Sequence, residues 1–203
     1  MDIPLFATPL LVHRFSKHQE YTDRIQLFER SSQKPSDWIC DLHTTFPNVD
    51  DNDVHLGGIV SDLKRDMLEE VKRIMREYDM TDQIMFNTFW YNAYLDGQGQ
   101  ELHNHLCSHN LCNPFWAGVY FHRNCHQGSF TFQNVNTELR TQQHHNWRKT
   151  RLAHYYNDII CPPIDDGDII LFPPHLYHSV KTDERNAKDM RLTFSFNVII
   201  DAT

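Results

Sequence analysis

The sequence lacks any hydrophobic run that could cross a membrane. A membrane-spanning helix needs about 20 consecutive apolar residues, and no stretch of this chain approaches that length. The opening segment MDIPLFATPLLVHRF also lacks the basic region of a secretory signal peptide, and it contains two prolines. We therefore expect no membrane partner and a cytoplasmic location.

Positive charge is also scarce. The chain has 19 Lys and Arg against 27 Asp and Glu, which gives a formal net charge of −8. A surface that binds nucleic acid needs clustered basic residues, so nucleic acid is not an expected partner. The 203 residues contain no repeat and no low-complexity linker, and this length suits one domain.

The number of cysteines is odd, which disfavours a framework of disulfides and indicates reduced thiols. Cys107, His109 and Cys112 could form a structural zinc site, but their spacing is not typical of one. We interpret this segment as a loop with incidental thiols. The five cysteines are Cys40, Cys107, Cys112, Cys125 and Cys161.

Hydrophobic periodicity divides the chain into two parts. Apolar residues recur with a helical period over residues 59–78, which predicts an amphipathic helix. From residue 84 onward, short aromatic and β-branched segments alternate with turn residues, which favours a barrel or sandwich of strands. We expect one domain over residues 1–203. Its N-terminal strands and support helix occupy 1–83, its barrel core occupies 84–203, and a long inserted loop or lid lies at about 134–157.

The motif LHNH places His103 and His105 two residues apart. On a strand, such residues point to the same face. His178 follows the strand-like segment GDIILFPP, and a small barrel could bring it to the other two. Neutral imidazoles bind iron, zinc, copper and nickel. In a chain with 14 histidines, however, the pair alone is more typical of exposed or structural histidines. His175 lies three residues before His178, so we expect it in a turn and not at the metal.

A second pair of residues follows in the segment RLTFSFNV. Arg191 and Thr193 share one face of the predicted strand. A guanidinium matches a carboxylate through two parallel hydrogen bonds, and the threonine adds a hydroxyl. The pair therefore predicts a docking point for a dicarboxylate. The alternative is a salt bridge between Arg191 and an internal Asp or Glu.

The ordered segments WYNAYLDGQGQELHNH, AGVYFHRN, GSFTF, PIDDGDIILFPPHLYHSV and RLTFSFNV resemble the iron- and 2-oxoglutarate-dependent oxygenase superfamily. Within it, they are most similar to a group of oxygenases from phages and marine bacteria. The resemblance extends from about Leu5 to Ile199. It implies a mainly β fold with flanking helices, the double-stranded β-helix, which is a jelly-roll or cupin-like barrel. If the chain is phage-encoded, its location would be the host cytoplasm.

Each matching position implies a role. His103 matches the first metal-binding histidine and His178 the last. Arg191 matches the residue that pairs with the far carboxylate of 2-oxoglutarate, with Thr193 as its helper. Two further residues on barrel strands could contact this cosubstrate, namely Tyr120 and Asn92.

His105 stands where most of the superfamily has Asp or Glu. Two interpretations remain open. His105 is the third metal ligand, or it supports the site from behind while water takes the third position. Three imidazoles would leave Fe(II) with a net charge of about +2, where a carboxylate would leave +1, and the extra charge favours a dianionic cosubstrate.

The resemblance implies an enzyme that uses Fe(II), 2-oxoglutarate and O2. It would hydroxylate a substrate that the sequence does not identify, with release of succinate and CO2. Two alternatives stay open: a three-histidine cupin dioxygenase that needs no 2-oxoglutarate, and a barrel that binds a ligand without catalysis. The pair of Arg191 and Thr193 favours the oxygenase over the cupin, which does not explain this pair. Metal-dependent turnover of 2-oxoglutarate would distinguish the oxygenase from a non-catalytic barrel.

Overall fold

The computed structural model describes residues 8–25, 38–40, 42–49, 58–95, 97–106, 114–124, 129–134, 159–181 and 190–201. Two helices and ten strands lie in these ranges. The inserted loop expected at 134–157 lies outside the described residues, apart from residue 134. The expected loop thiols Cys107 and Cys112 also lie outside them.

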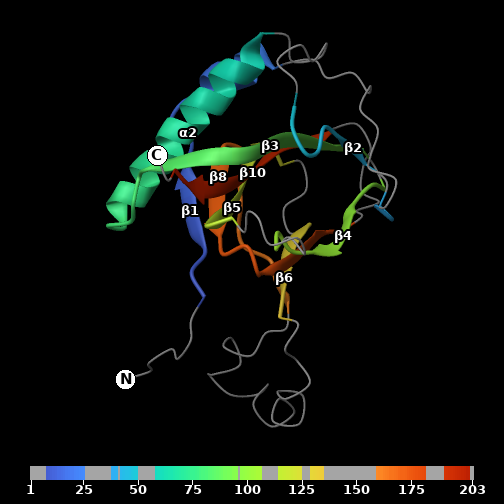
Figure 1. Ribbon diagram of the computed structural model, residues 1–203. Coiled ribbons are helices and arrows are strands. Elements are labelled where there is room, and N and C mark those ends of the chain that lie inside the picture. Colours follow the sequence, from blue (N-terminus) through green and yellow to red (C-terminus); the bar gives the residue numbers. More distant parts are fainter. Residues whose placement is uncertain are drawn as a thin grey trace.

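The larger sheet has six antiparallel strands in the order β1-β8-β5-β10-β3-β2 (Figure 1). The N-terminal part of the chain supplies both edge strands, so residues before 84 complete the barrel as well as supporting it. The strands are β1 (Leu11–Arg14), β8 (Asp168–Phe172), β5 (Trp116–Arg123), β10 (Arg191–Ile200), β3 (Ile84–Tyr94) and β2 (His43–Thr44).

The smaller sheet has four antiparallel strands in the order β4-β9-β6-β7. These are β4 (Gln100–His103), β9 (Tyr177–Val180), β6 (Phe130–Gln133) and β7 (Ile159–Ile160). Short antiparallel strands in two sheets give the mainly β arrangement that the sequence predicts.

Helix α2 (Ile59–Glu77) covers the outer face of the larger sheet (Figure 1). The expected helix over 59–78 therefore forms, and its last residue is the only difference. A short helix, α1 (His18–Arg24), was not expected from the sequence. No helix in the described ranges is long and apolar enough to cross a membrane. The buried apolar side chains of α2 are Val60, Leu63, Met67, Val71, Ile74 and Met75.

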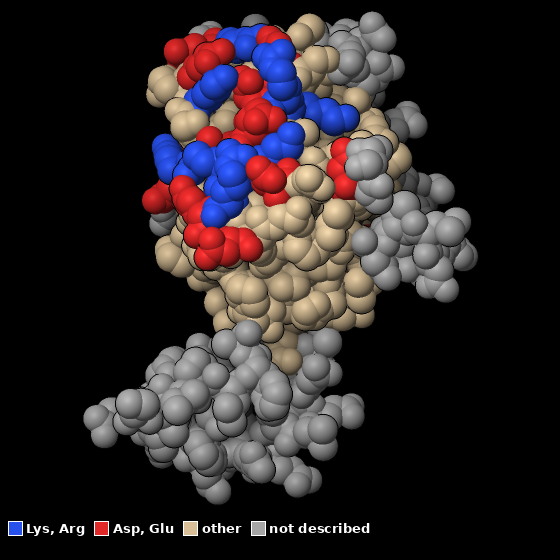
Figure 2. Space-filling model, turned by 60° about the vertical axis from the view of Figure 1, so that its left-hand side comes forward, with Lys and Arg blue, Asp and Glu red and all other residues tan. Residues whose placement is uncertain are grey.

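The solvent-facing side of this region carries both signs of charge. Figure 2 shows basic and acidic side chains interspersed there. Ion pairs along α2 join them, for example Arg65 with Asp62 at 2.9 Å and Lys72 with Glu69 at 3.1 Å. This face therefore presents no continuous basic surface.

Strand alternation assigns each face of the larger sheet a different role. On β3, Phe89, Tyr91 and Ala93 join the core beneath the helices. Their neighbours Trp90, Asn92 and Tyr94 point the other way, into the space between the two sheets. An apolar layer that includes Phe121 and Phe172 of the larger sheet and Phe130 and Val180 of the smaller sheet closes part of this space. The remaining part is a pocket.

Candidate metal centre

The register between β4 and β9 brings the first and last histidines together. His103 ends β4 and lies directly opposite His178 on β9. His105 comes after the strand has ended, although both histidines of LHNH were expected on one strand. Its backbone N–H donates to the carbonyl oxygen of Pro174 at 2.8 Å, which ties it to the turn before β9. The three side chains thus converge through turn contacts as well as strand alternation.

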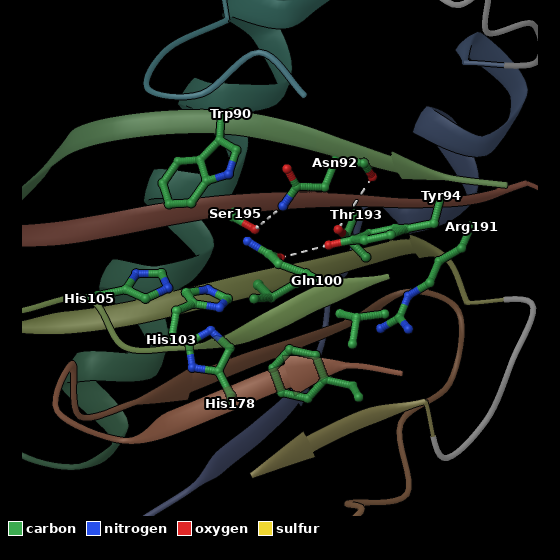
Figure 3. Close-up of a pocket in the computed structure, with 13 residues that line it drawn as sticks. Trp90, Asn92, Tyr94, Gln100, His103, His105, His178, Arg191, Thr193 and Ser195 are labelled. Atoms are coloured by element: carbon green, nitrogen blue, oxygen red, sulfur yellow. Dashed lines mark hydrogen bonds between the residues drawn. The ribbon is translucent and has the colours of Figure 1, made fainter. Parts of the chain in front are cut away.

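The convergence is close. One candidate ligand atom from each of His103, His105 and His178 lies within 4.8 Å of the other two. The ring centroids of His103 and His178 are 4.2 Å apart, and those of His105 and His178 are 5.0 Å apart. Figure 3 shows the three rings at one end of the pocket.

Backbone carbonyls orient two of the rings. The Nδ1–H of His103 donates to the carbonyl oxygen of Glu101 at 2.8 Å. The Nδ1–H of His178 donates to that of Leu176 at 3.0 Å. A carbonyl oxygen can only accept, so the proton of each neutral ring resides on Nδ1 and the lone pair on Nε2. This is the usual arrangement of a metal-binding histidine, whose second nitrogen donates to an oxygen.

His105 has the same arrangement with a different partner. Its Nδ1 lies 2.6 Å from Oδ1 of Asn197 on β10, 92 residues further along the chain. With Nδ1–H donating to this amide oxygen, Nε2 of His105 also keeps its lone pair. Asn197 was not expected at this centre from the sequence.

Burial keeps the three rings neutral. It lowers the pKa of His103, and it lowers the pKa of His105 to about 4. Burial, with the nearby His103 and His105, also holds the pKa of His178 well below its ordinary value. At neutral pH the rings are therefore in the form that binds metal ions, and binding does not require them to lose protons.

The donor set fits a divalent transition metal ion. Three neutral imidazoles suit Fe, Co, Ni, Cu or Zn, whereas Mg²⁺ and Ca²⁺ prefer oxygen ligands. His103, His105 and His178 form the group of potential metal ligands found in the described part of the chain, and this group contains no carboxylate.

Arg191 lies at the opposite end of the same pocket (Figure 3). It is the first residue of β10, and only 1% of its surface is exposed. Its guanidinium carbon lies 5.6 Å from the centre of the Tyr94 ring and 5.4 Å from that of Phe121. One guanidinium nitrogen donates to the hydroxyl of Ser129. These contacts hold a buried positive charge in a defined position.

Polar side chains fill the space between the histidines and Arg191. Thr193 Oγ1 donates to the carbonyl oxygen of Asn92 at 3.5 Å, and Asn92 Nδ2 donates to Ser195 Oγ at 3.4 Å. The Tyr94 hydroxyl donates to Oε1 of Gln100 at 2.9 Å. All five side chains line the pocket. The sequence predicted Asn92 and Thr193 here but missed Tyr94, although Tyr94 follows Asn92 at the same strand spacing.

Two buried polar atoms in this pocket have no partner among the described residues. They are Oδ1 of Asn92, a residue that is 2% exposed, and Nε1 of Trp90, a residue that is 4% exposed. A buried polar group without a hydrogen bond is costly, so a polar ligand would satisfy a need that the protein leaves open.

The structure does not bring Tyr120 to the pocket. Its neighbour Val119 lines the pocket, so Tyr120 points to the helix side of β5. There its hydroxyl lies 2.8 Å from Nδ1 of His18 and 3.3 Å from Nδ1 of His122. His175 is exposed in the turn before β9, as the sequence predicts.

The sequence of the barrel core matches a known protein family. Residues 88–197, more than half of the chain, match the model of a protein family described as "Putative 2OG-Fe(II) oxygenase". The chain belongs to this family. It is therefore an oxidoreductase of the 2-oxoglutarate-dependent oxygenases, whose cofactors are Fe(II) and 2-oxoglutarate and which also use O2. No curated protein sequence matches the chain.

Solved structures share the fold at low sequence identity. An oxidoreductase of the 2OG-Fe(II) oxygenase family from Burkholderia pseudomallei has a TM-score of 0.60 and 11% identity, over 93% of this chain and 84% of that one. A Trichoplax adhaerens prolyl hydroxylase, in complex with a hypoxia inducible factor peptide, has a TM-score of 0.57 and 12% identity, over 95% and 84%. HygX from Streptomyces hygroscopicus, with nickel, 2-oxoglutarate and hygromycin B bound, has a TM-score of 0.57 and 11% identity, over 94% and 82%. These similarities confirm the predicted double-stranded β-helix.

Proposed function

We propose that the protein is a dioxygenase that hydroxylates a substrate still to be identified and converts 2-oxoglutarate to succinate and CO2. One observation supports this proposal above the others. Three neutral imidazoles, with His178 buried, and a buried guanidinium occupy the two ends of one polar pocket. The first suits a metal ion, and the second suits the far carboxylate of a dicarboxylate.

We assign His103, His105 and His178 as the metal ligands, each through Nε2. Their Nδ1–H groups are already used by oxygen acceptors, which leaves Nε2 of each ring for the metal. Fe(II) bound there would supply the activation of O2, for which protein side chains alone are poorly suited.

We assign Arg191 and Thr193 to the far carboxylate of 2-oxoglutarate. The guanidinium can meet a carboxylate through parallel hydrogen bonds, and Thr193 Oγ1 can donate a further one. Asn92 lies between this end and the histidines, and its amide can bond the cosubstrate along its length. Three neutral ligands leave the full charge of a divalent ion at the other end, which favours a dianion.

Apolar residues enclose the same pocket. Val119 lies on the larger sheet, and Phe130 and Val180 lie on the smaller sheet. All three are buried. Side chains of this kind limit the access of water, which strengthens the electrostatic contacts of Arg191 and the metal.

The two alternatives are less well supported. A three-histidine cupin dioxygenase that does not use 2-oxoglutarate would explain the imidazoles but not the buried Arg191. A barrel that binds a ligand without catalysis would explain neither the tautomers nor the family match. A single domain over residues 1–203, a cytoplasmic location and a particular closeness to phage and marine bacterial oxygenases stay predictions.

Anaerobic titration of the Fe(II) protein with 2-oxoglutarate tests the proposal. Chelation of Fe(II) by the keto acid gives a visible charge-transfer band, so we expect a saturable band in the wild type. Arg191→Gln should weaken binding of 2-oxoglutarate by more than about tenfold, because it removes a charged hydrogen-bonding partner. Arg123→Gln, at the half-buried end of β5, is the matched control and should leave the affinity unchanged.

Two further measurements make the result decisive. Thermal unfolding of each variant shows whether Arg191→Gln is still folded, and succinate release under O2 shows whether the bound cosubstrate is turned over. A folded wild type that shows no band at saturating Fe(II) and 2-oxoglutarate would contradict the proposal and favour the cupin or ligand-binding alternative.

A further inference from the structure

Asn197 is the residue that distinguishes His105 from the other two histidines. His103 and His178 each donate Nδ1–H to a backbone carbonyl two residues earlier in their own segment. His105 instead meets the side-chain oxygen of Asn197, at 2.6 Å, from a different sheet. We propose that Asn197 is a positioning residue that sets the tautomer of His105 and thereby makes it the third metal ligand. This inference rests on the proposed function.

The sequence of β10 places Asn197 where this role needs it. Arg191, Thr193 and Ser195 occupy alternate positions and line the pocket, and Asn197 is the next residue in this series. The residues between them, Leu192, Phe194 and Phe196, belong to the core beneath the helices. One face of one strand therefore carries both the proposed carboxylate partner and the support of the metal ligand.

The strand pairing between β10 and β3 is irregular at Asn197. The pairing of β10 with β3 is regular up to Asn197 opposite Thr88, and it then shifts so that Val198 lies opposite Phe86. Such bulges change the direction of nearby side chains and are frequent next to active sites. The shift lies at the residue that reaches His105.

His105 needs a partner of this kind because it lies beyond the end of β4. The backbone contact of His105 with Pro174 fixes its main chain but does not determine which ring nitrogen carries the proton. An acceptor on Nδ1 fixes both the ring and its proton. Without it, an imidazole that carries its proton on Nε2 could not bind a metal through that atom.

The chemical type of the partner also matters. An amide oxygen accepts the hydrogen bond without adding negative charge, whereas a carboxylate at the same place would add one. With His105 in place of the carboxylate ligand and Asn197 behind it, the full positive charge of the metal stays available to anionic ligands. His105 and Asn197 therefore both leave the positive charge of the metal without a neutralising carboxylate.

The reverse orientation of the Asn197 amide would give the other tautomer of His105, and this difference makes the proposal testable. If the amide of Asn197 were turned around, its Nδ2–H would donate to Nδ1 of His105. Nε2 would then carry the proton, and His105 would be a structural residue beside a site with two histidine ligands. The tautomer of His105 in the metal-free protein separates these two arrangements.

The first measurement is long-range ¹H–¹⁵N NMR of the metal-free protein at pH 7.5, with resonances assigned by His→Gln variants. We expect the Nδ1–H tautomer for His105 in the wild type, its loss in Asn197→Leu and its retention in Asn197→Asp. Asn124→Leu removes an amide that also makes a long-range hydrogen bond, to the carbonyl oxygen of Ile164, but lies outside the pocket, so it is the matched control and His105 should keep its tautomer there. An Nε2–H tautomer in the wild type, or no change in Asn197→Leu, would overturn the proposal.

The second measurement is the affinity for Ni²⁺, determined by competition with a chelator. Loss of a hydrogen bond behind a metal ligand typically weakens binding about 10–100-fold, and we expect a loss of this size in Asn197→Leu. Asn197→Asp should recover most of it, and Asn124→Leu should bind Ni²⁺ like the wild type. Equal Ni²⁺ affinity in Asn197→Leu and the wild type would refute the positioning role.

The two measurements also separate this inference from the proposed function. The tautomer requires neither metal nor cosubstrate. If the NMR and Ni²⁺ results follow expectation but 2-oxoglutarate gives no charge-transfer band, the role of Asn197 stands and the proposed reaction fails.

Discussion

His103 and His178 lie opposite each other in the antiparallel pair of β4 and β9, with their ring centroids 4.2 Å apart. A slip of one residue between these strands would turn one of the two side chains to the other face of the sheet. The convergence of these two imidazoles thus depends on the register of the smaller sheet. A metal ion that joins the two residues would in turn stabilise this register against slippage.

If a metal ion joins β4 to β9 through His103 and His178, removal of His178 should have two effects. His178→Ala should weaken Ni²⁺ binding by more than about 100-fold, because losing a ligand costs more than losing the group behind it. It should also abolish the rise in unfolding temperature that Ni²⁺ gives the wild type. Chelator competition and thermal unfolding with and without Ni²⁺ measure both effects. His175→Ala, three residues earlier and exposed, should behave like the wild type.

Protonation of the buried His122 should make the free energy of unfolding depend on pH. Burial lowers the pKa of this residue to about 4, against 6.5 in the unfolded chain. Between these values the unfolded chain binds more protons, so folding is favoured at higher pH and stability is lost as the pH falls below 6.5. From pH 7 to pH 5, His122 alone should cost about 2 kcal/mol of unfolding free energy.

Burial also lowers the pKa of His103, His105 and His178. The contribution of His122 is therefore measured as the difference in pH dependence between the wild type and a variant that lacks this ring. Urea unfolding of metal-free wild type and His122→Phe at both pH values should show a smaller loss in the variant. His175→Phe should keep the loss seen in the wild type. A His122→Phe variant with an undiminished pH dependence would contradict this assignment.

Tyr120→Phe should affect stability and not cosubstrate binding. The Tyr120 hydroxyl is buried between His18 and His122 on the helix side of β5. Its loss leaves buried ring nitrogens with one partner fewer, which typically costs about 1–3 kcal/mol. Urea unfolding measures the cost, and the charge-transfer titration should give an unchanged affinity for 2-oxoglutarate. A large loss of affinity would mean that Tyr120 acts at the pocket after all.

Asn92→Asp should weaken 2-oxoglutarate binding more than Asn92→Ala does. Asn92 is 2% exposed and lies between the histidines and Arg191. A carboxylate there would stand close to a dianion in a poorly hydrated pocket, so we expect a loss of more than about tenfold beyond that of the alanine variant. The affinity for Ni²⁺ without 2-oxoglutarate should stay within about threefold of the wild type in Asn92→Ala, which removes the amide without adding charge. Similar 2-oxoglutarate affinities in the two variants would place the cosubstrate elsewhere.

Several features of the fold were predictable because they depend on local periodicity. The helical period over 59–78 and the alternation over β3 and β10 appear in the structure nearly as the sequence indicates. Helix α1 was missed because it has only seven residues, too few for a clear period.

Contacts across long distances in the sequence were harder to predict. His103, His105 and His178 could be grouped because their spacing resembles a known pattern. Asn197 could not be grouped with them, since its role depends on a contact over 92 residues and on a shift in strand pairing. Tyr120 was expected at the pocket because it lies on a barrel strand. A strand has two faces, and only the tertiary structure shows that Val119 takes the inner one.

The position of β10 between β5 and β3 has a consequence for how the pocket can change. Arg191 and Asn197 are six residues apart on this strand, about 20 Å along an extended backbone, and hydrogen-bonded strands on both sides hold β10 in place. The separation of these two residues is thus set by one strand, and a movement of one sheet relative to the other cannot alter it. Adaptation to differently shaped substrates would have to come from the opposite wall, where the strands are short, while the separation of Arg191 and Asn197 stays constant.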